Sequence, residues 1–148
     1  MKIKEIMTKD VITVKENTPI SEIAKIMLEK KIHAVPVVND ENKILGIITE
    51  TDFFTKDSSN MVYMPSLIDF INSGKMEYGE EEKEAVHAVL HAKAKDIMSS
   101  KCENISPEMN MEDFIKLIKD KSFNSYPVVD ESNILIGIIT VADAIKLL

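Results

Sequence analysis

The strongest constraint on this chain is an internal repeat. Shifting the sequence by 91 positions places Pro36–Val38 on Pro127–Val129 and Gly46–Thr49 on Gly137–Thr140, with no gap between these anchors. A constant offset of this kind means that one supersecondary unit occurs twice. Residues 56–93 have no counterpart. We therefore expect a first repeat over 1–55, a connector over 56–93 and a second repeat over 94–148.

Each repeat is predicted to hold a short extended arm, a helix, a β-hairpin and a closing helix. Thr18 before Pro19 predicts the N-cap of the first helix, and Asn110 predicts the N-cap of its equivalent. Apolar runs on nearly every strand residue predict burial on both faces, so neither repeat is expected to be stable alone. The strands are predicted at Ala34–Val38, Ile44–Ile48, Ser125–Val129 and Leu135–Ile139.

The connector is predicted to be partly helical. One helix is expected from Pro65 to Gly74, and a second from residue 79 or 80 to Ala92. The acidic run 80–82 suits the positive end of the second helix dipole and is interpreted as a solvated helix start.

Charge and composition exclude several classes of protein. The formal net charge of -7 argues against nucleic acid as a partner, because such binders rely on clustered positive charge. No apolar run approaches the roughly 20 residues of a membrane span, and the first ten residues do not form a signal peptide. A single cysteine, Cys102, fits a reducing compartment. We expect a cytoplasmic protein with no membrane partner.

The strand-to-helix corners are the predicted binding feature. Each corner reads Gly-Ile-Ile-Thr-x-x-Asp, ending at Thr49 and Asp52 in the first repeat and at Thr140 and Asp143 in the second. Backbone N–H groups at such a turn seat an anion, and a carboxylate accepts hydrogen bonds from both hydroxyls of a ribose.

These duplicated motifs resemble the CBS (cystathionine-β-synthase) domain pair. The likeness rests on Val35–Val38 with Gly46–Asp52, echoed by Tyr126–Val129 with Gly137–Asp143, and it covers all of the chain except the connector. It implies an α+β fold in which two repeats of a short sheet and flanking helices pack as a pseudo-two-fold pair. It also implies a flat homodimer and clefts for an adenosine-type ligand.

The resemblance assigns roles within those clefts. The aspartates are expected to contact ribose, and the threonines ribose or phosphate. Residues around each strand proline and each arm are expected to line the adenine slot. The implied set is Thr13, Val14, Ala34, Val35, Pro36, Thr49 and Asp52 from the first repeat, and Asn104, Ile105, Ser125, Tyr126, Pro127, Thr140 and Asp143 from the second.

Several of these residues have a structural alternative. Thr-x-x-Asp at a helix start is also a capping box. Gly46 and Gly137 are interpreted as positions where two backbones approach closely. Tyr126 is predicted either to stack on a base or to fill the core with its hydroxyl hydrogen-bonded.

The sequence also bears on ligand identity. The implied candidates are AMP, ADP, ATP, S-adenosylmethionine and NAD. Between Thr and Asp this chain has Glu50-Thr51 and Val141-Ala142 instead of a basic residue, which argues against a di- or triphosphate and favours an AMP-like ligand. The lysines at 9, 31, 101 and 121 are interpreted as surface residues. The two clefts differ, so one good site is expected.

Catalysis and metal binding have no motif in this sequence. His87 and His91 are four apart on a predicted helix, but no further ligand completes a zinc site. His33 is interpreted as a packed histidine. No cofactor is expected, and the chain is not expected to be an enzyme. Two functions remain: an adenosine-ligand sensor that acts on an effector protein, or a ligand-independent dimerisation module.

Overall fold

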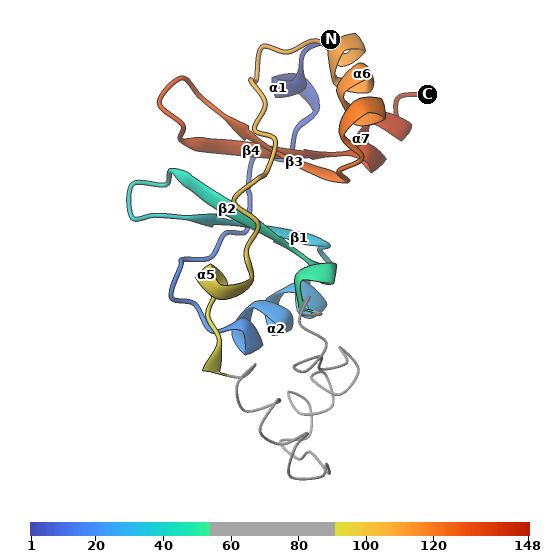
Figure 1. Cartoon of the computed structure of the whole chain (residues 1–148). Coiled ribbons are helices and arrows are strands. Elements are labelled where there is room, and N and C mark those ends of the chain that lie inside the picture. The colour runs from blue at the N-terminus through green and yellow to red at the C-terminus, as the bar shows by residue number, and fades with distance from the viewer. Residues whose placement is uncertain (54–90) are drawn as a thin grey trace.

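Two antiparallel hairpins, one from each repeat, form the framework of the fold (Figure 1). In this computed structural model, which describes residues 1–53 and 91–148, β1 (Ala34–Val38) pairs with β2 (Ile44–Thr49), and β3 (Ser125–Val129) pairs with β4 (Leu135–Thr140). The registers are equivalent, with a bulge after Val37 and after Val128. Both predicted hairpins are confirmed. The predicted helix from Pro65 to Gly74, the acidic run and most of the second connector helix lie outside the described residues.

Asparagine and aspartate side chains shape the turn of each hairpin. The Asn39 Oδ1 atom accepts hydrogen bonds from the backbone N–H groups of Glu41 and Lys43, both at 2.9 Å. Asp130 plays the same role in the second hairpin. Asn42 and Asn133 have φ of 64° and 65°, a conformation that asparagine tolerates better than most residues.

The two long helices begin differently. In α6 (Met111–Lys121), the Asn110 side chain accepts a hydrogen bond from the Asp113 N–H at 2.9 Å, so the predicted N-cap is confirmed. In α2 (Ile20–Lys30), the N-cap is Pro19 and not Thr18. Thr18 Oγ1 instead accepts from the Lys15 N–H at 3.0 Å. The first helical N–H, that of Ile20, donates to the carbonyl of Ala92 at 3.1 Å.

The arms of the two repeats are exchanged. The short helix α1 (Ile3–Ile6) lies on the second repeat, where Ile3 is fully buried with Phe114 and Tyr126. The equivalent helix α5 (Ala94–Ile97) lies on the first repeat, where Ala94 is buried beside α2. Main-chain hydrogen bonds of 2.9 Å hold both helices, from the Ile3 N–H to Met109 and from the Ala94 N–H to Thr18.

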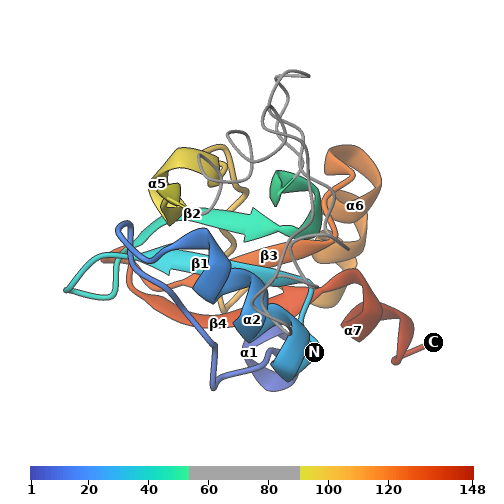
Figure 2. The same cartoon turned by 90° about the horizontal axis from the view of Figure 1, so that it is seen from below.

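Each arm then crosses to its own repeat along the partner hairpin. Thr8 forms an antiparallel bridge with Ile138 of β4, and Ser99 forms the equivalent bridge with Ile47 of β2. Farther on, Val14 pairs with Val37 in the arm's own repeat, as Ile105 does with Val128. Figure 2 shows the two hairpins overlying each other between the helices.

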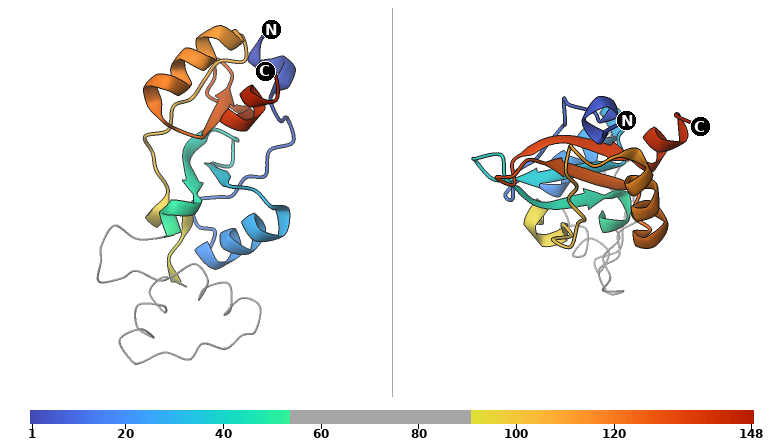
Figure 3. Two further views of the ribbon diagram at one scale, coloured as in Figure 1. Left: turned by 90° about the vertical axis from the view of Figure 1, so that its right-hand side faces the viewer. Right: turned by 90° about the horizontal axis from the view of Figure 1, so that it is seen from above.

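The hairpins stack against each other, and the helices cover their outer sides (Figure 3). Val38, Ile44 and Leu135 form a small apolar cluster between the repeats. Each repeat also has its own core between hairpin and helices. This arrangement places the ends of β2 and β4, and the corners that follow them, near one shared space. Within the part of the chain described, no helix has the length and apolar character of a membrane span.

Candidate ligand-binding cleft

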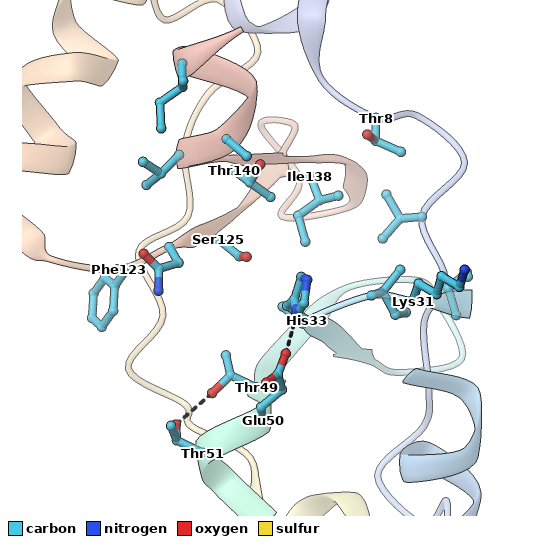
Figure 4. Close-up of a pocket in the computed structure, with 18 of the residues that line it drawn as sticks. Thr8, Lys31, His33, Thr49, Glu50, Thr51, Phe123, Ser125, Ile138 and Thr140 are labelled. Carbon is cyan, nitrogen blue, oxygen red and sulfur yellow. Dashed lines mark hydrogen bonds and ion pairs between the residues drawn. The ribbon is translucent and has the colours of Figure 1, made fainter. Parts of the chain in front are cut away.

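A cleft of about 830 Å³ lies between the repeats at the strand ends (Figure 4). Its lining comes from both repeats in almost symmetric fashion, because the residues before β1 and β3 and after β2 and β4 share one edge of the stacked hairpins. Seven pairs of lining residues are related by the offset of the repeat. They are Lys31 and Ser122, Ile32 and Phe123, His33 and Asn124, Ala34 and Ser125, Thr49 and Thr140, Glu50 and Val141, and Thr51 and Ala142.

The first arm breaks this symmetry. Thr8, Asp10, Val11 and Ile12 line the cleft, whereas no residue of the second arm does so within the described ranges. Thr8 is fixed there by two main-chain hydrogen bonds with Ile138, of 2.9 and 3.0 Å. The cleft is therefore closed on one side by the exchanged arm of the first repeat.

Both strand-to-helix corners are capped by their own aspartates. In the second repeat, where α7 (Val141–Ile145) begins, Asp143 Oδ2 accepts from the Thr140 N–H at 2.9 Å and from its hydroxyl at 3.1 Å, and Thr140 Oγ1 accepts from the Asp143 N–H at 3.2 Å. In the first repeat, at the 3₁₀ turn η1 (Glu50–Phe53), Asp52 Oδ2 makes the first two contacts with Thr49, at 2.8 and 3.2 Å.

The capping alternative is thus present at both corners, and it commits one oxygen of each carboxylate. The second oxygen of Asp52 accepts no hydrogen bond from the described residues, and that of Asp143 lies 3.8 Å from the Lys146 ammonium. Each aspartate therefore keeps one oxygen for a hydroxyl of a ligand, and not the two that the sequence analysis assumed.

Four of the predicted site residues line the cleft: Ala34, Thr49, Ser125 and Thr140. Asp52 and Asp143 stand directly behind the two threonines. The other predicted residues are not part of this lining, and their role in ligand binding stays a prediction. Val14, Val35, Pro36, Ile105, Tyr126 and Pro127 are buried, while Thr13 is half-buried and Asn104 is exposed.

Strand geometry explains why these residues lie away from the lining. Val35 and Val37 point from one face of β1 into the core that the hairpin shares with α2, and Val14 and Ile105 pack where each arm pairs with its own hairpin. Within the hairpins, the strand ends and Ile138 of β4 reach the cleft.

Tyr126 is a core aromatic and not a stacking platform. Its ring contacts that of Phe114 edge to face, with centroids 5.3 Å apart and planes at 85°. The hydroxyl is buried and has no hydrogen-bond partner among the described residues. Burial raises the pKa of the Tyr126 hydroxyl. The expectation of a satisfied hydroxyl is therefore wrong.

Residues just before each first strand and just after each second strand line the cleft without having been predicted from the sequence. His33 was interpreted as packed, but its side chain is 85% exposed and contacts the Glu50 carboxylate at the cleft. The hairpin pairing could have indicated these residues, because the start of β1 pairs with the end of β2, as Ala34 does with Thr49.

Metal ligation has no support in the described residues. In ranges 1–53 and 91–148, no three His, Cys, Asp or Glu side chains are placed to hold an ion. His87, the partner proposed for His91, lies outside these ranges.

Two proteins of one archaeal organism are similar to this chain in sequence. An uncharacterized protein of Methanocaldococcus jannaschii is 32% identical over 157 residues, covering 100% of this chain and 91% of the relative. Another uncharacterized protein of that organism is also 32% identical, but the chain spans only 42% of it.

Two solved structures share the architecture. CBSX2 in complex with AMP has a TM-score of 0.71 and 21% identity, covering 99% of this chain and 94% of that one. A CBS domain pair in complex with 5′-methylthioadenosine and S-adenosyl-L-methionine has a TM-score of 0.70 and 21% identity, with the same coverage. The CBS domain family matches residues 3–58 and 94–148 of this chain. With both repeats matched and the paired hairpins in place, this chain belongs to the CBS domain family as a tandem pair.

Proposed function

We propose that this chain is a regulatory module that binds an adenosine-containing ligand in the cleft between its repeats. The observation that carries the proposal is the pair of Thr-x-x-Asp corners beside one shared cavity. Thr49 and Thr140 line the cavity, and behind each of them stands a carboxylate with one oxygen that accepts no hydrogen bond from the described residues, that of Asp143 lying 3.8 Å from the Lys146 ammonium. No catalytic step is assigned to the chain.

The size and lining of the cleft suit a nucleoside. Its volume of about 830 Å³ lies within the range of small-molecule sites. Val11, Ile12, Ile32 and Ile138 offer apolar surface for a flat base. Hydroxyl groups of Ser125 and of the two threonines supply the few polar contacts that orient such a ligand.

Similar proteins support the chemical class of the ligand. CBSX2 was crystallised with AMP, and another CBS pair with 5′-methylthioadenosine and S-adenosylmethionine. These ligands share adenosine and differ at the 5′ position. An adenosine ligand of AMP size is the proposed class here, with ADP, ATP and NAD as larger candidates to be tested.

The position of the cleft explains how binding becomes a signal. Both repeats and the exchanged arm contribute to its wall, so a ligand that fits one relative placement of the repeats shifts the protein toward that placement. The proposed output is a change in the contacts of a homodimer or of an effector protein. We propose that this occurs in the cytoplasm.

A ligand-independent dimerisation module is the second candidate. It is favoured by apolar side chains at the C-terminal end, where Ile145, Leu147 and Leu148 are 61%, 45% and 97% exposed. Light scattering of the wild type and of Ile145→Ser with Leu147→Ser tests this function, which predicts a ligand-free dimer that the double variant dissociates.

Thermal unfolding with a ligand panel tests the sensor function. AMP, 5′-methylthioadenosine, S-adenosylmethionine, ADP, ATP and NAD are added to the wild type and to Asp143→Ala. A ligand at 100 times its Kd stabilises the protein by roughly 2.7 kcal/mol, which raises Tm by about 5 °C.

The aspartate variant separates binding from capping. Asp143→Ala loses the cap of α7, so each shift is measured from the variant's own ligand-free midpoint. Asp120→Ala, an exposed residue of α6, serves as the control. A smaller shift in Asp143→Ala alone supports the proposal, and a panel with no shift in the wild type contradicts it.

A further inference from the structure

We propose, building on the sensor function above, that the cleft selects adenosine ligands with an uncharged or cationic 5′ group over phosphorylated ones. A thioether such as 5′-methylthioadenosine and a sulfonium such as S-adenosylmethionine are the two chemical classes. This replaces the AMP-like expectation with a ligand of similar size and different charge.

Acidic groups dominate the charge of the cleft. Asp10 and Glu50 are the carboxylates of the described lining, and Lys31 is its one ammonium. Lys31 is the C-cap residue of α2, with a left-handed backbone conformation (φ of 55°), and its side chain is exposed. The fourth ionisable group is His33, which contacts Glu50 (Figure 4). A phosphate entering this space meets two carboxylates and one ammonium, beside an imidazole that contacts one of the carboxylates.

The usual donors for a phosphate are already engaged. At Thr49 and at Thr140, both the backbone N–H and the side-chain hydroxyl donate to the aspartate three residues later. A second anion at either corner would lie beside that carboxylate. The sequence also contains no arginine, so the bidentate guanidinium contact that phosphate sites favour does not exist in this chain.

The half of the cleft built by the second repeat carries no ionisable side chain. Where the first repeat has Lys31, His33 and Glu50, the second has Ser122, Asn124 and Val141. Ile138 and Ile145 extend this surface with apolar side chains. Such a wall accommodates a methylthio group, while Asp10 and Glu50 across the cleft attract a sulfonium.

Isothermal titration calorimetry with three ligands tests this selectivity. The wild type is expected to bind 5′-methylthioadenosine and S-adenosylmethionine about tenfold more tightly than AMP. The variant Glu50→Gln removes one carboxylate and keeps the size of the side chain. It is expected to strengthen AMP binding about fivefold and to weaken S-adenosylmethionine about fivefold. The affinity for 5′-methylthioadenosine is expected to change less than about twofold.

Glu131→Gln is the matched control, because Glu131 is an exposed residue in the turn between β3 and β4 and does not line the cleft. A second measurement needs no variant. Added salt screens the cleft and is expected to strengthen AMP binding by the wild type while leaving 5′-methylthioadenosine unchanged.

The results distinguish this inference from the function on which it rests. If AMP binds more tightly than 5′-methylthioadenosine, or if Glu50→Gln shifts all three affinities alike, the selectivity is wrong and the sensor function stands. Absence of binding by all three ligands overturns both.

Discussion

Gly46 and Gly137 let the exchanged arms approach the hairpins. A Cβ atom on Gly46 would lie 2.8 Å from the Ser99 carbonyl oxygen and 3.0 Å from the Met98 sulfur. A Cβ on Gly137 would clash with the Met7 sulfur and would lie 3.1 Å from the Thr8 carbonyl oxygen. The interpretation of both glycines as packing positions is confirmed.

The two glycines are expected to differ in their sensitivity to alanine. At Gly46 the nearest obstacle is backbone, held by the bridge between Ile47 and Ser99, whereas at Gly137 it is the flexible side chain of Met7. Gly46→Ala is therefore expected to lower the free energy of unfolding by about 1–3 kcal/mol, and Gly137→Ala by less. Urea unfolding measures both, and a larger loss at Gly137 would contradict this reasoning.

Glu108 ties the N-terminus to the second repeat. Its carboxylate contacts the ammonium groups of Lys2 at 2.6 Å and Lys4 at 2.8 Å. These hydrogen bonds, that of Lys2 first, lower the pKa of Glu108 from 4.5 to about 2.

A lowered folded-state pKa means that the pair stabilises the fold above pH 4.5 and that this contribution disappears as pH falls toward 2. Glu108→Gln is expected to be slightly less stable than the wild type at pH 7, because these residues are exposed. The difference in stability between this variant and the wild type is expected to disappear in acid. Urea midpoints at pH 7, 4 and 3 measure it, with Glu131→Gln as the control, and a gap independent of pH refutes the assignment.

At the level of elements, the repeats use different means to begin equivalent helices. In both helices the first N–H donates to a carbonyl of the exchanged arm, from Ile20 to Ala92 and from Met111 to Met1, but only α6 also has a side-chain cap, that of Asn110. Asn110→Ala is accordingly expected to lower the free energy of unfolding by about 1 kcal/mol.

Thr18→Ala tests the difference, because Thr18 was the predicted cap and is not the observed one. It removes only the turn contact with Lys15 and is expected to cost less than Asn110→Ala. Thermal unfolding of both variants measures which loses more stability. Equal losses of stability would indicate that Thr18 caps α2 after all.

Sequence reasoning succeeded where the signal is local. Apolar runs and turn residues placed the hairpins, and the repeat offset located the corners at Thr49 and Thr140. It failed where contacts are distant. Nothing in the pattern around Ile3 shows that this residue fills the core beside Phe114, or that the arm residues Val11 and Ile12 face the cleft and Val14 does not.

At the scale of the whole molecule, each core contains part of the other repeat. Ile3 belongs to the second core and Ala94 to the first, and the cleft lies between the two. Ile3→Ala is expected to lower the free energy of unfolding by about 2–5 kcal/mol. Ile145→Ala, at an exposed residue of α7, is the matched control, and equal losses in urea unfolding would contradict the exchange.

The exchanged arms have a thermodynamic consequence. Because neither core is complete without a segment from the other half, heat cannot melt one half and leave its neighbour intact. Calorimetry is therefore expected to record one endotherm whose calorimetric and van't Hoff enthalpies agree. Two modules in sequence would then form a single cooperative unit, so that a ligand held at one edge protects the backbone amides of both from exchange.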